Sequence, residues 1–83
     1  MENPIKERID ELGISIRAAA RILDLSQPVV LRHYRGERRP SFDSMELYSG
    51  RLGISLGTLR DWARYKRKEM DEEKRKAASS SKN

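Results

Sequence analysis

The sequence contains no cysteine, and this absence removes two ways in which small domains are commonly stabilised. Without cysteine neither a disulfide nor a thiolate-bound metal cluster can form. The single histidine, His33, also argues against a metal site built from nitrogen ligands. We therefore expect no metal and no cofactor. A chain of 83 residues has only one modest core, so a partner subunit is the remaining common source of additional burial.

Long apolar runs are also missing. Residues 1–8 are charged and lack the apolar centre of a signal peptide. No apolar run in the sequence approaches the length that crosses a membrane. The absence of cysteine is compatible with a reducing compartment. These features predict a soluble intracellular protein that makes no contact with a membrane.

The residue patterns typical of enzymes are absent as well. The sequence has no cysteine nucleophile, no glycine-rich phosphate loop and no paired carboxylates that would converge from different elements. Aromatic residues make up only 6% of the chain and fall on apolar stripes, which argues against a stacking surface for single-stranded RNA. We expect no catalytic residue and no small-molecule ligand.

What the sequence does have is positive charge, and it is unevenly distributed. The formal net charge is +5, with 12 arginines against 6 lysines. Residues 27–41 carry +3 and residues 60–83 carry +4, whereas the two remaining segments each carry −1. Arginine presents a planar fork of donors that suits phosphates and guanine edges. The pattern favours a polyanion partner, with an ordinary basic surface as the alternative.

Capping residues, glycines and apolar periodicity together predict five helices. The expected spans are 4–12, 16–23, 27–35, 42–52 and 56 to about 78. Each span is preceded by a residue that commonly caps a helix N-terminus, in chain order Asn3, Ser15, Ser26, Ser41 and Ser55. Three of them end at a glycine: Gly13, Gly36 and Gly53. We expect a globular part at 1–65, a charged helical extension at 66–78 and a disordered tail at 79–83.

The second and third expected helices are joined by a tight turn. Ala19 and Ala20 lie on the inner face of the second helix, where larger side chains would hold the third helix away. Two short helices that cross in this way can place one of them in a DNA major groove. The other apolar residues expected to face inward are Ile5, Ile9, Leu12, Leu23, Phe42, Met45, Leu47, Tyr48, Leu52, Leu59, Trp62 and Ala63.

Several residues between Ile14 and Leu56 carry a family resemblance. They are the Ser15 cap, the Ala19–Ala20 pair, Leu23, Leu25, Ser26, Val30, the loop from Gly36 to Ser41, and the run from Leu52 to Leu56. With this spacing and no gap, the chain resembles the phage-repressor and Cro-like helix-turn-helix family, the XRE group. The resemblance implies an all-α, compact five-helix domain of the lambda-repressor type, here with an extended C-terminal helix.

The same resemblance implies a function. Members usually act as homodimers that bind a palindromic operator in double-stranded DNA, so we expect a transcriptional repressor of phage, prophage or plasmid type in the bacterial cytoplasm, associated with the nucleoid. By position, the residues facing the bases are Gln27, Pro28, Val29 and Arg32. Those facing phosphates are Ser15, Arg17, Ser26, Arg35, Arg38, Arg39 and Ser41.

Each of these assignments has a simpler alternative. Arg32 contacts either the edge of a guanine, which the motif favours, or a phosphate. Gln27 contacts an adenine or the backbone, and Val29 contacts a thymine methyl group or shields the turn. Arg38 and Arg39 hold phosphates or lie in a solvated loop.

The chain also departs from the family pattern. Ile16 replaces a frequent glutamine at the start of the second helix, so Arg17 is expected to take its phosphate contact. Asp24 occupies a turn position that usually holds glycine, which aspartate tolerates. Ile9 and Tyr34 stand where an ion pair is common, which predicts an apolar contact. His33 replaces an aliphatic core residue, and we interpret it as a hydrogen-bonded core histidine that adds mild pH dependence.

The C-terminal helix leaves two hypotheses open. Trp62, Tyr65 and Met70 are candidate dimer contacts, although for Trp62 the pattern favours the core of one subunit. The basic residues between 64 and 68 are more typical of a solvated face than of a DNA contact. The alternative to a repressor is an antitoxin-like protein that binds a partner through this helix, with DNA binding as autoregulation.

Overall fold

A computed structural model describes residues 1–81, which form five helices and no strand. They are α1 (Pro4–Leu12), α2 (Ile16–Leu23), α3 (Gln27–Arg35), α4 (Phe42–Leu52) and α5 (Leu56–Ser81). The all-α prediction and the bounds of the first four helices are confirmed. The last helix ends at Ser81, three residues beyond the predicted end near residue 78. Of the expected disordered tail, residues 82–83 lie outside the described part.

Local capping explains why the first four helices begin and end where the sequence predicted. The Ser15 hydroxyl accepts a hydrogen bond from the amide of Ala18 at 3.0 Å, and Ser41 caps α4 in the same way. At the other end of α2, Asp24 adopts a φ of 57°, the left-handed conformation expected of it. Ser26 has the backbone of an N-cap but makes no capping hydrogen bond with its side chain. The predicted cap at the start of α3 is therefore only a backbone cap.

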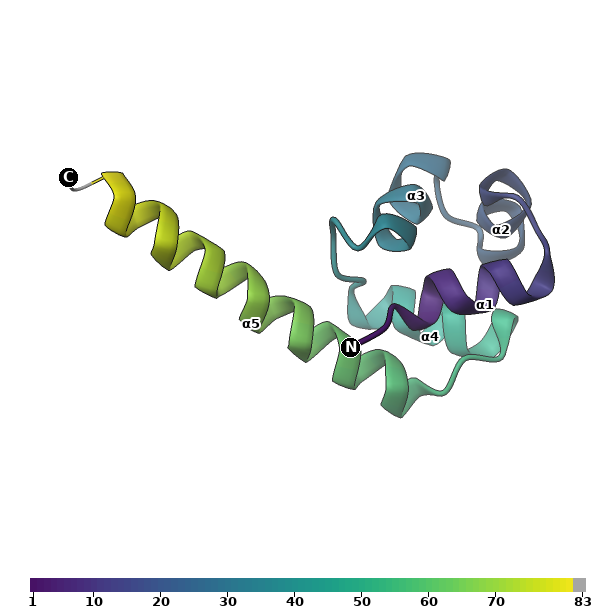
Figure 1. Ribbon diagram of the computed structural model, residues 1–83. Coiled ribbons are helices and arrows are strands. Elements are labelled where there is room, and N and C mark those ends of the chain that lie inside the picture. Colours follow the sequence, from purple (N-terminus) through teal and green to yellow (C-terminus); the bar gives the residue numbers. More distant parts are fainter. Residues whose placement is uncertain (82–83) are drawn as a thin grey trace.

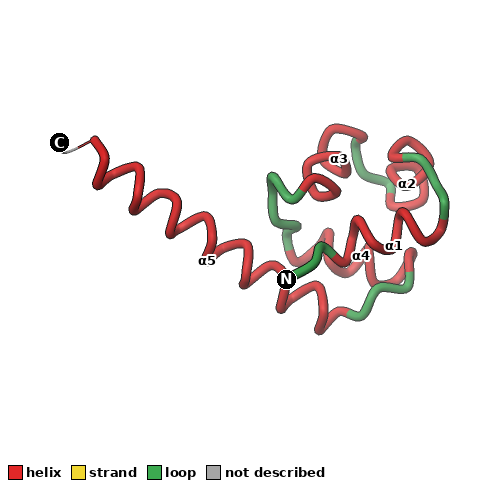
Figure 2. Tube along the Cα trace, viewed as in Figure 1, coloured by secondary structure: helices red, strands yellow, loops and turns green. Residues whose placement is uncertain are grey.

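The five helices are arranged as a small body from which one helix projects. In Figure 1, α2 and α3 lie on one side of the body, and α1 and α4 lie on the other. The start of α5 packs against α1 and α4, and its remainder leaves the body, so the molecule measures 47 × 24 × 21 Å. Figure 2 shows that α5 is helical without interruption. Within residues 1–81 no helix is long and apolar enough to cross a membrane.

The core lies between the first four helices and the start of α5. Trp62 is only 1% exposed and is the largest of its fully buried side chains. Ala19 and Ala20 are buried at the α2–α3 crossing, as expected. Leu12 and Phe42, which were predicted to face inward, are 42% and 54% exposed. Both stand at the end of a helix, where the apolar stripe has turned beyond the edge of the neighbouring helices.

Candidate nucleic-acid interface

The outer face of α3 is the centre of the candidate interface. Val30 and His33 are buried and attach the helix to the body. The predicted base-contacting residues lie away from that inner face: Gln27, Pro28 and Arg32 are exposed, and Val29 is half-buried. Positions 28, 32 and 35 follow the i, i+4, i+7 spacing of one helical face. Of these, Arg32 and Arg35 give this exposed face its positive charge.

The predicted phosphate-contacting residues are all exposed, and they flank α3 on several elements. Ser15 and Arg17 lie at the start of α2, Ser26 precedes α3, and Ser41 precedes α4. Helix N-termini favour anions because their first amides point outward. The structure thus presents three helix starts around the residues expected to read the bases.

The loop after α3 adds further arginines. Arg35 lies 3.9 Å from Glu37, an exposed and weak ion pair. Arg38 and Arg39 are exposed on the same loop, while Pro40, which follows them, is buried and fixes the loop to the body. This placement is compatible with the predicted phosphate role of both arginines and equally with a solvated loop.

His33 is held in the core as a neutral group. It is 1% exposed, and its Nδ1 lies 2.8 Å from the hydroxyl oxygen of Tyr48, with which it shares a hydrogen bond. The two rings also meet edge to face, with centroids 5.6 Å apart. Burial, helped by the charge of Arg38, lowers the pKa of His33 to about 4. The interpretation of His33 as a hydrogen-bonded core histidine is confirmed.

Tyr34 packs against the core cluster that contains Ile9, and the contact between α1 and α3 also has a polar part that was not predicted. The Tyr34 hydroxyl donates a hydrogen bond of 2.7 Å to Asp10, and the ammonium of Lys6 lies 5.2 Å from the centre of the Tyr34 ring. Lys6 and Tyr34 together lower the pKa of the Asp10 carboxyl. The sequence pattern missed this polar contact because Asp10 is adjacent to the position compared with the family, and not at it.

Three helix C-termini are held by side chains from elsewhere in the chain, and the sequence signalled none of them. Arg8 Nε donates to the carbonyl of Leu52 in α4 at 2.7 Å, and Arg51 Nη1 donates to the carbonyl of Ile22 in α2 at 2.9 Å. Asn3 donates to the end of α3. Such contacts satisfy carbonyls that a helix cannot pair internally. Of the three, only the Asn3 contact reaches α3, the helix at the centre of the candidate interface.

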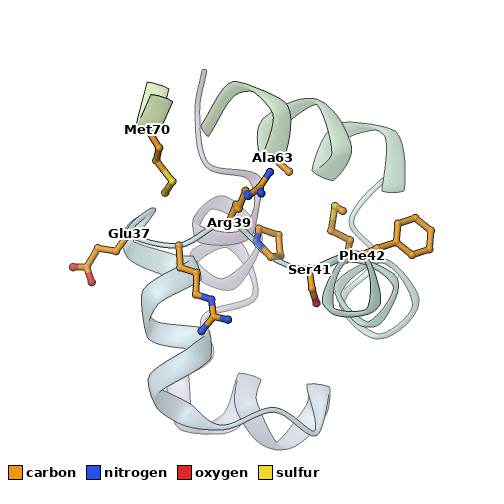
Figure 3. Close-up of a pocket in the computed structure, with 9 residues that line it drawn as sticks. Glu37, Arg39, Ser41, Phe42, Ala63 and Met70 are labelled. Atoms are coloured by element: carbon orange, nitrogen blue, oxygen red, sulfur yellow. The ribbon is translucent and has the colours of Figure 1, made fainter. Parts of the chain in front are cut away.

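An open hollow of about 570 Å³ lies between the loop after α3 and the projecting helix. It is lined by Glu37, Arg38, Arg39, Pro40, Ser41, Phe42, Met45, Ala63 and Met70. Figure 3 shows Met70 projecting from α5 toward this loop. Met70 is half-buried and Tyr65 is 43% exposed, so both remain candidate dimer contacts. Trp62 belongs to the core of one subunit, the alternative that its pattern favoured, and does not offer a surface to a partner.

The described residues contain no group of three potential metal ligands. Comparison with known families gives one match: the Helix-turn-helix family model matches residues 5–68, most of the chain. No curated protein and no solved structure matches the chain. The matched region includes α1 from its second residue, all of α2 to α4, and the half of α5 that packs on the body.

Proposed function

The chain belongs to the helix-turn-helix family of the phage-repressor and Cro-like type, whose members are DNA-binding transcriptional regulators, and from this premise we propose that it is a sequence-specific repressor that reads the major groove with α3. The observation that carries the proposal is the two-sided character of α3. Its inner face, Val30 and His33, is buried, and its outer face presents Gln27, Pro28 and Arg32. A helix of this size with a polar outer face fits the major groove of B-form DNA.

In this proposal the side chains divide into two roles. Arg32 donates two hydrogen bonds to a guanine edge, Gln27 pairs with an adenine, and Pro28 and Val29 contact the neighbouring bases. The phosphates on either side are held from the starts of the helices and from the loop after α3, by Ser15, Arg17, Ser26, Arg35, Arg38, Arg39 and Ser41. Phosphate contacts set the register of the protein on the duplex, and base contacts supply the specificity.

The protein acts as a homodimer on a palindromic operator, with the two copies of α3 one helical turn apart. Met70, which lines the hollow, and the exposed Tyr65 contribute to the dimer contact. Repression follows from occupation of the operator and requires no chemical step. The DNA partner places the protein with the nucleoid in the cytoplasm of a bacterial cell, as expected of a phage, prophage or plasmid repressor.

Selection of bound sequences from a random DNA pool tests the proposal. We expect a palindromic consensus, and an affinity that falls steeply between two salt concentrations because phosphate contacts release counterions. A selection that enriches no sequence would contradict sequence-specific binding. A consensus without a repeated half-site would contradict the dimer.

Arg32→Ala then tests the role of one residue. We expect it to relax the preference at one symmetric pair of positions, at a cost of about 1–3 kcal/mol per site. Arg60→Ala, an exposed arginine on α5, removes the same charge away from α3 and serves as the control. A uniform loss of affinity for all sequences in the Arg32 variant would make Arg32 a phosphate contact.

A second candidate function rests on the projection of α5. The helix extends beyond the body over residues with both signs of charge, a surface that a protein partner could cover (Figure 1). In this antitoxin-like role, α5 neutralises a partner and DNA binding provides autoregulation. Deleting residues 66–83 distinguishes the two functions: loss of a co-purifying partner with DNA binding retained supports the second.

A further inference from the structure

The side chain of Asn3 joins the beginning of one helix to the end of another. Its Oδ1 accepts hydrogen bonds from the amides of Ile5 and Lys6 at 2.9 and 3.2 Å, which caps α1. Its Nδ2 donates to the carbonyl oxygens of His33 and Tyr34 at 2.8 and 3.1 Å, which lie in the last turn of α3. The side-chain amide has two donors and one acceptor oxygen, and all of them are used.

The contact joins a helix that is short and has no side-chain cap at its start. The helix has nine residues, too few to be stable by itself, and its N-cap Ser26 makes no side-chain hydrogen bond. At its last turn, the amide of Gly36 bonds to the carbonyl of His33 and the amide of Glu37 to that of Arg32. Asn3 is a donor to this turn from outside the helix.

A side chain of α5, Lys66, also lies close to the contact between Asn3 and α3. A Cβ atom added at Gly36 would lie 3.7 Å from Lys66 Nζ and 3.9 Å from Asn3 Nδ2. The Lys66 side chain is only 16% exposed and is held by an ion pair of 3.1 Å with Glu69. The end of α3 is therefore flanked by Asn3 from the start of α1 and by Lys66 from α5.

We propose that Asn3 is a positioning residue for DNA recognition: its amide fixes the C-terminal end of α3 to α1 and so sets the tilt at which the outer face of α3 enters the groove. This inference rests on the proposed function. Asn3 does not touch DNA in this role and acts through α3. A tilt of a short helix displaces the side chains that read the bases, and contacts to base edges tolerate little displacement.

The choice of asparagine can be tested, because other capping residues share only half of its chemistry. Aspartate and serine cap helix N-termini about as well as asparagine does. Aspartate has no N–H group, and serine has a single, shorter donor, so neither can serve two carbonyls of α3. Asn3→Asp and Asn3→Ser therefore keep the cap of α1 and lose the link to α3.

Arg8→Met is the matched control. It removes the corresponding hydrogen bond to the end of α4 at Leu52, and like Asn3→Asp it lowers the net charge by one. Asn3→Ser leaves the charge unchanged, so an effect common to both Asn3 variants does not come from charge. Circular dichroism and urea unfolding first establish that each variant folds.

The first measurement needs no DNA. Amide hydrogen exchange at Gly36 and Glu37 is expected to be about tenfold faster in both Asn3 variants, while Ile5 and Lys6 stay protected. In Arg8→Met these four amides exchange as in the wild type. Unchanged exchange at Gly36 and Glu37 in both Asn3 variants overturns the inference, because α3 would then be held without Asn3.

The second measurement compares affinity for the selected operator with affinity for unrelated DNA. We expect the ratio to fall about tenfold in both Asn3 variants and to stay within about twofold of wild type in Arg8→Met. An equal fall in all three variants, or none in the Asn3 variants, overturns the positioning role. If the wild type itself prefers no sequence, the proposed function fails, and the exchange measurement still decides whether Asn3 holds α3.

Discussion

Helix α3, which we propose reads the DNA, and the projecting part of α5, residues 66–76, are held in opposite ways. α3 is short, but contacts distant in the sequence fix it on several sides: the amide of Asn3, the His33–Tyr48 hydrogen bond and the Tyr34–Asp10 hydrogen bond. In residues 66–76 the hydrogen bond between side chains, from Lys66 to Glu69, stays within one turn. Most of these residues are exposed.

Helix α3 is held by contacts distant in the sequence, and the projecting part of α5 is held by local ones. The orientation of α3 is a property of the whole body, as required of an element that must meet base edges at fixed positions. The projecting part of α5 depends on local helix propensity and neighbouring charge pairs. Changes to the contacts that hold α3 should therefore alter folding and recognition, and changes to the projection beyond Met70 should alter neither unless a partner binds there.

The largest expected effect comes from the part of α5 that belongs to the body. Trp62→Ala should lower the free energy of unfolding by about 3–5 kcal/mol, because it empties a buried site at the centre of the core. Tyr65→Ala, one turn along the same helix but exposed, should change it by less than about 0.5 kcal/mol. Urea denaturation measures both. Similar losses in the two variants would contradict the placement of Trp62 in the core and of Tyr65 on the surface.

The buried His33 of α3 should make the free energy of unfolding depend on pH. The pKa of His33 is about 4 in the folded protein, below its ordinary value near 6.5, so the unfolded chain binds more protons between these values. Stability is complete above the unfolded pKa and should fall by about 2 kcal/mol between about pH 7.5 and pH 5. His33→Leu removes the titrating group, so its stability should lose this slope. The same slope in both proteins would assign it to other groups.

The beginnings of α2 and α3 offer a smaller contrast. Ser15→Ala should cost about 1 kcal/mol of stability, because the hydroxyl caps α2. Ser26→Ala should cost little, because the Ser26 hydroxyl makes no capping hydrogen bond. Thermal unfolding compares the two variants. An equal loss of stability would mean that Ser26 caps α3 in solution, and that α3 is held at both ends.

Removing the residues beyond Met70 should have the smallest effect on folding. A chain that ends at Met70 keeps the Lys66–Glu69 pair and loses only residues beyond the hollow. Its free energy of unfolding should stay within about 0.5 kcal/mol of the full chain. Thermal and urea unfolding check this, with Tyr65→Ala as the comparison. Clear destabilisation would show that the projection supports the body.

The sequence predicted most of the fold because the signals that begin and end helices are local. Asn3, Ser15 and Ser41 cap their helices, and Gly13 and Gly36 stop theirs, as their residue types suggested. Periodicity was less informative at helix ends. Leu12 and Phe42 fit the apolar stripe but are exposed, because burial there depends on where the neighbouring helices stop.

The contacts that orient the interface were not predictable in the same way. Asn3 and Tyr34 are separated by 31 residues, and nothing in either local pattern indicates that a side-chain amide meets a helix carbonyl. Tyr34 was recognised as unusual only by comparison with a family pattern, and its hydrogen bond to Asp10 was not predicted. The residues predicted to face DNA are exposed except for Val29, which is half-buried, and their assignment to bases or phosphates stays a prediction.

Because α5 is one uninterrupted helix of 26 residues, it is about 39 Å long, and only its first part is attached to the body. A chain without cysteine accepts a single thiol as a unique point of attachment. Glu72→Cys would place a spin label or fluorophore on an exposed turn of α5, well beyond the core residues. The separation between two such labels on one operator would then report, in a single spectroscopic distance, how the two copies of the molecule are oriented.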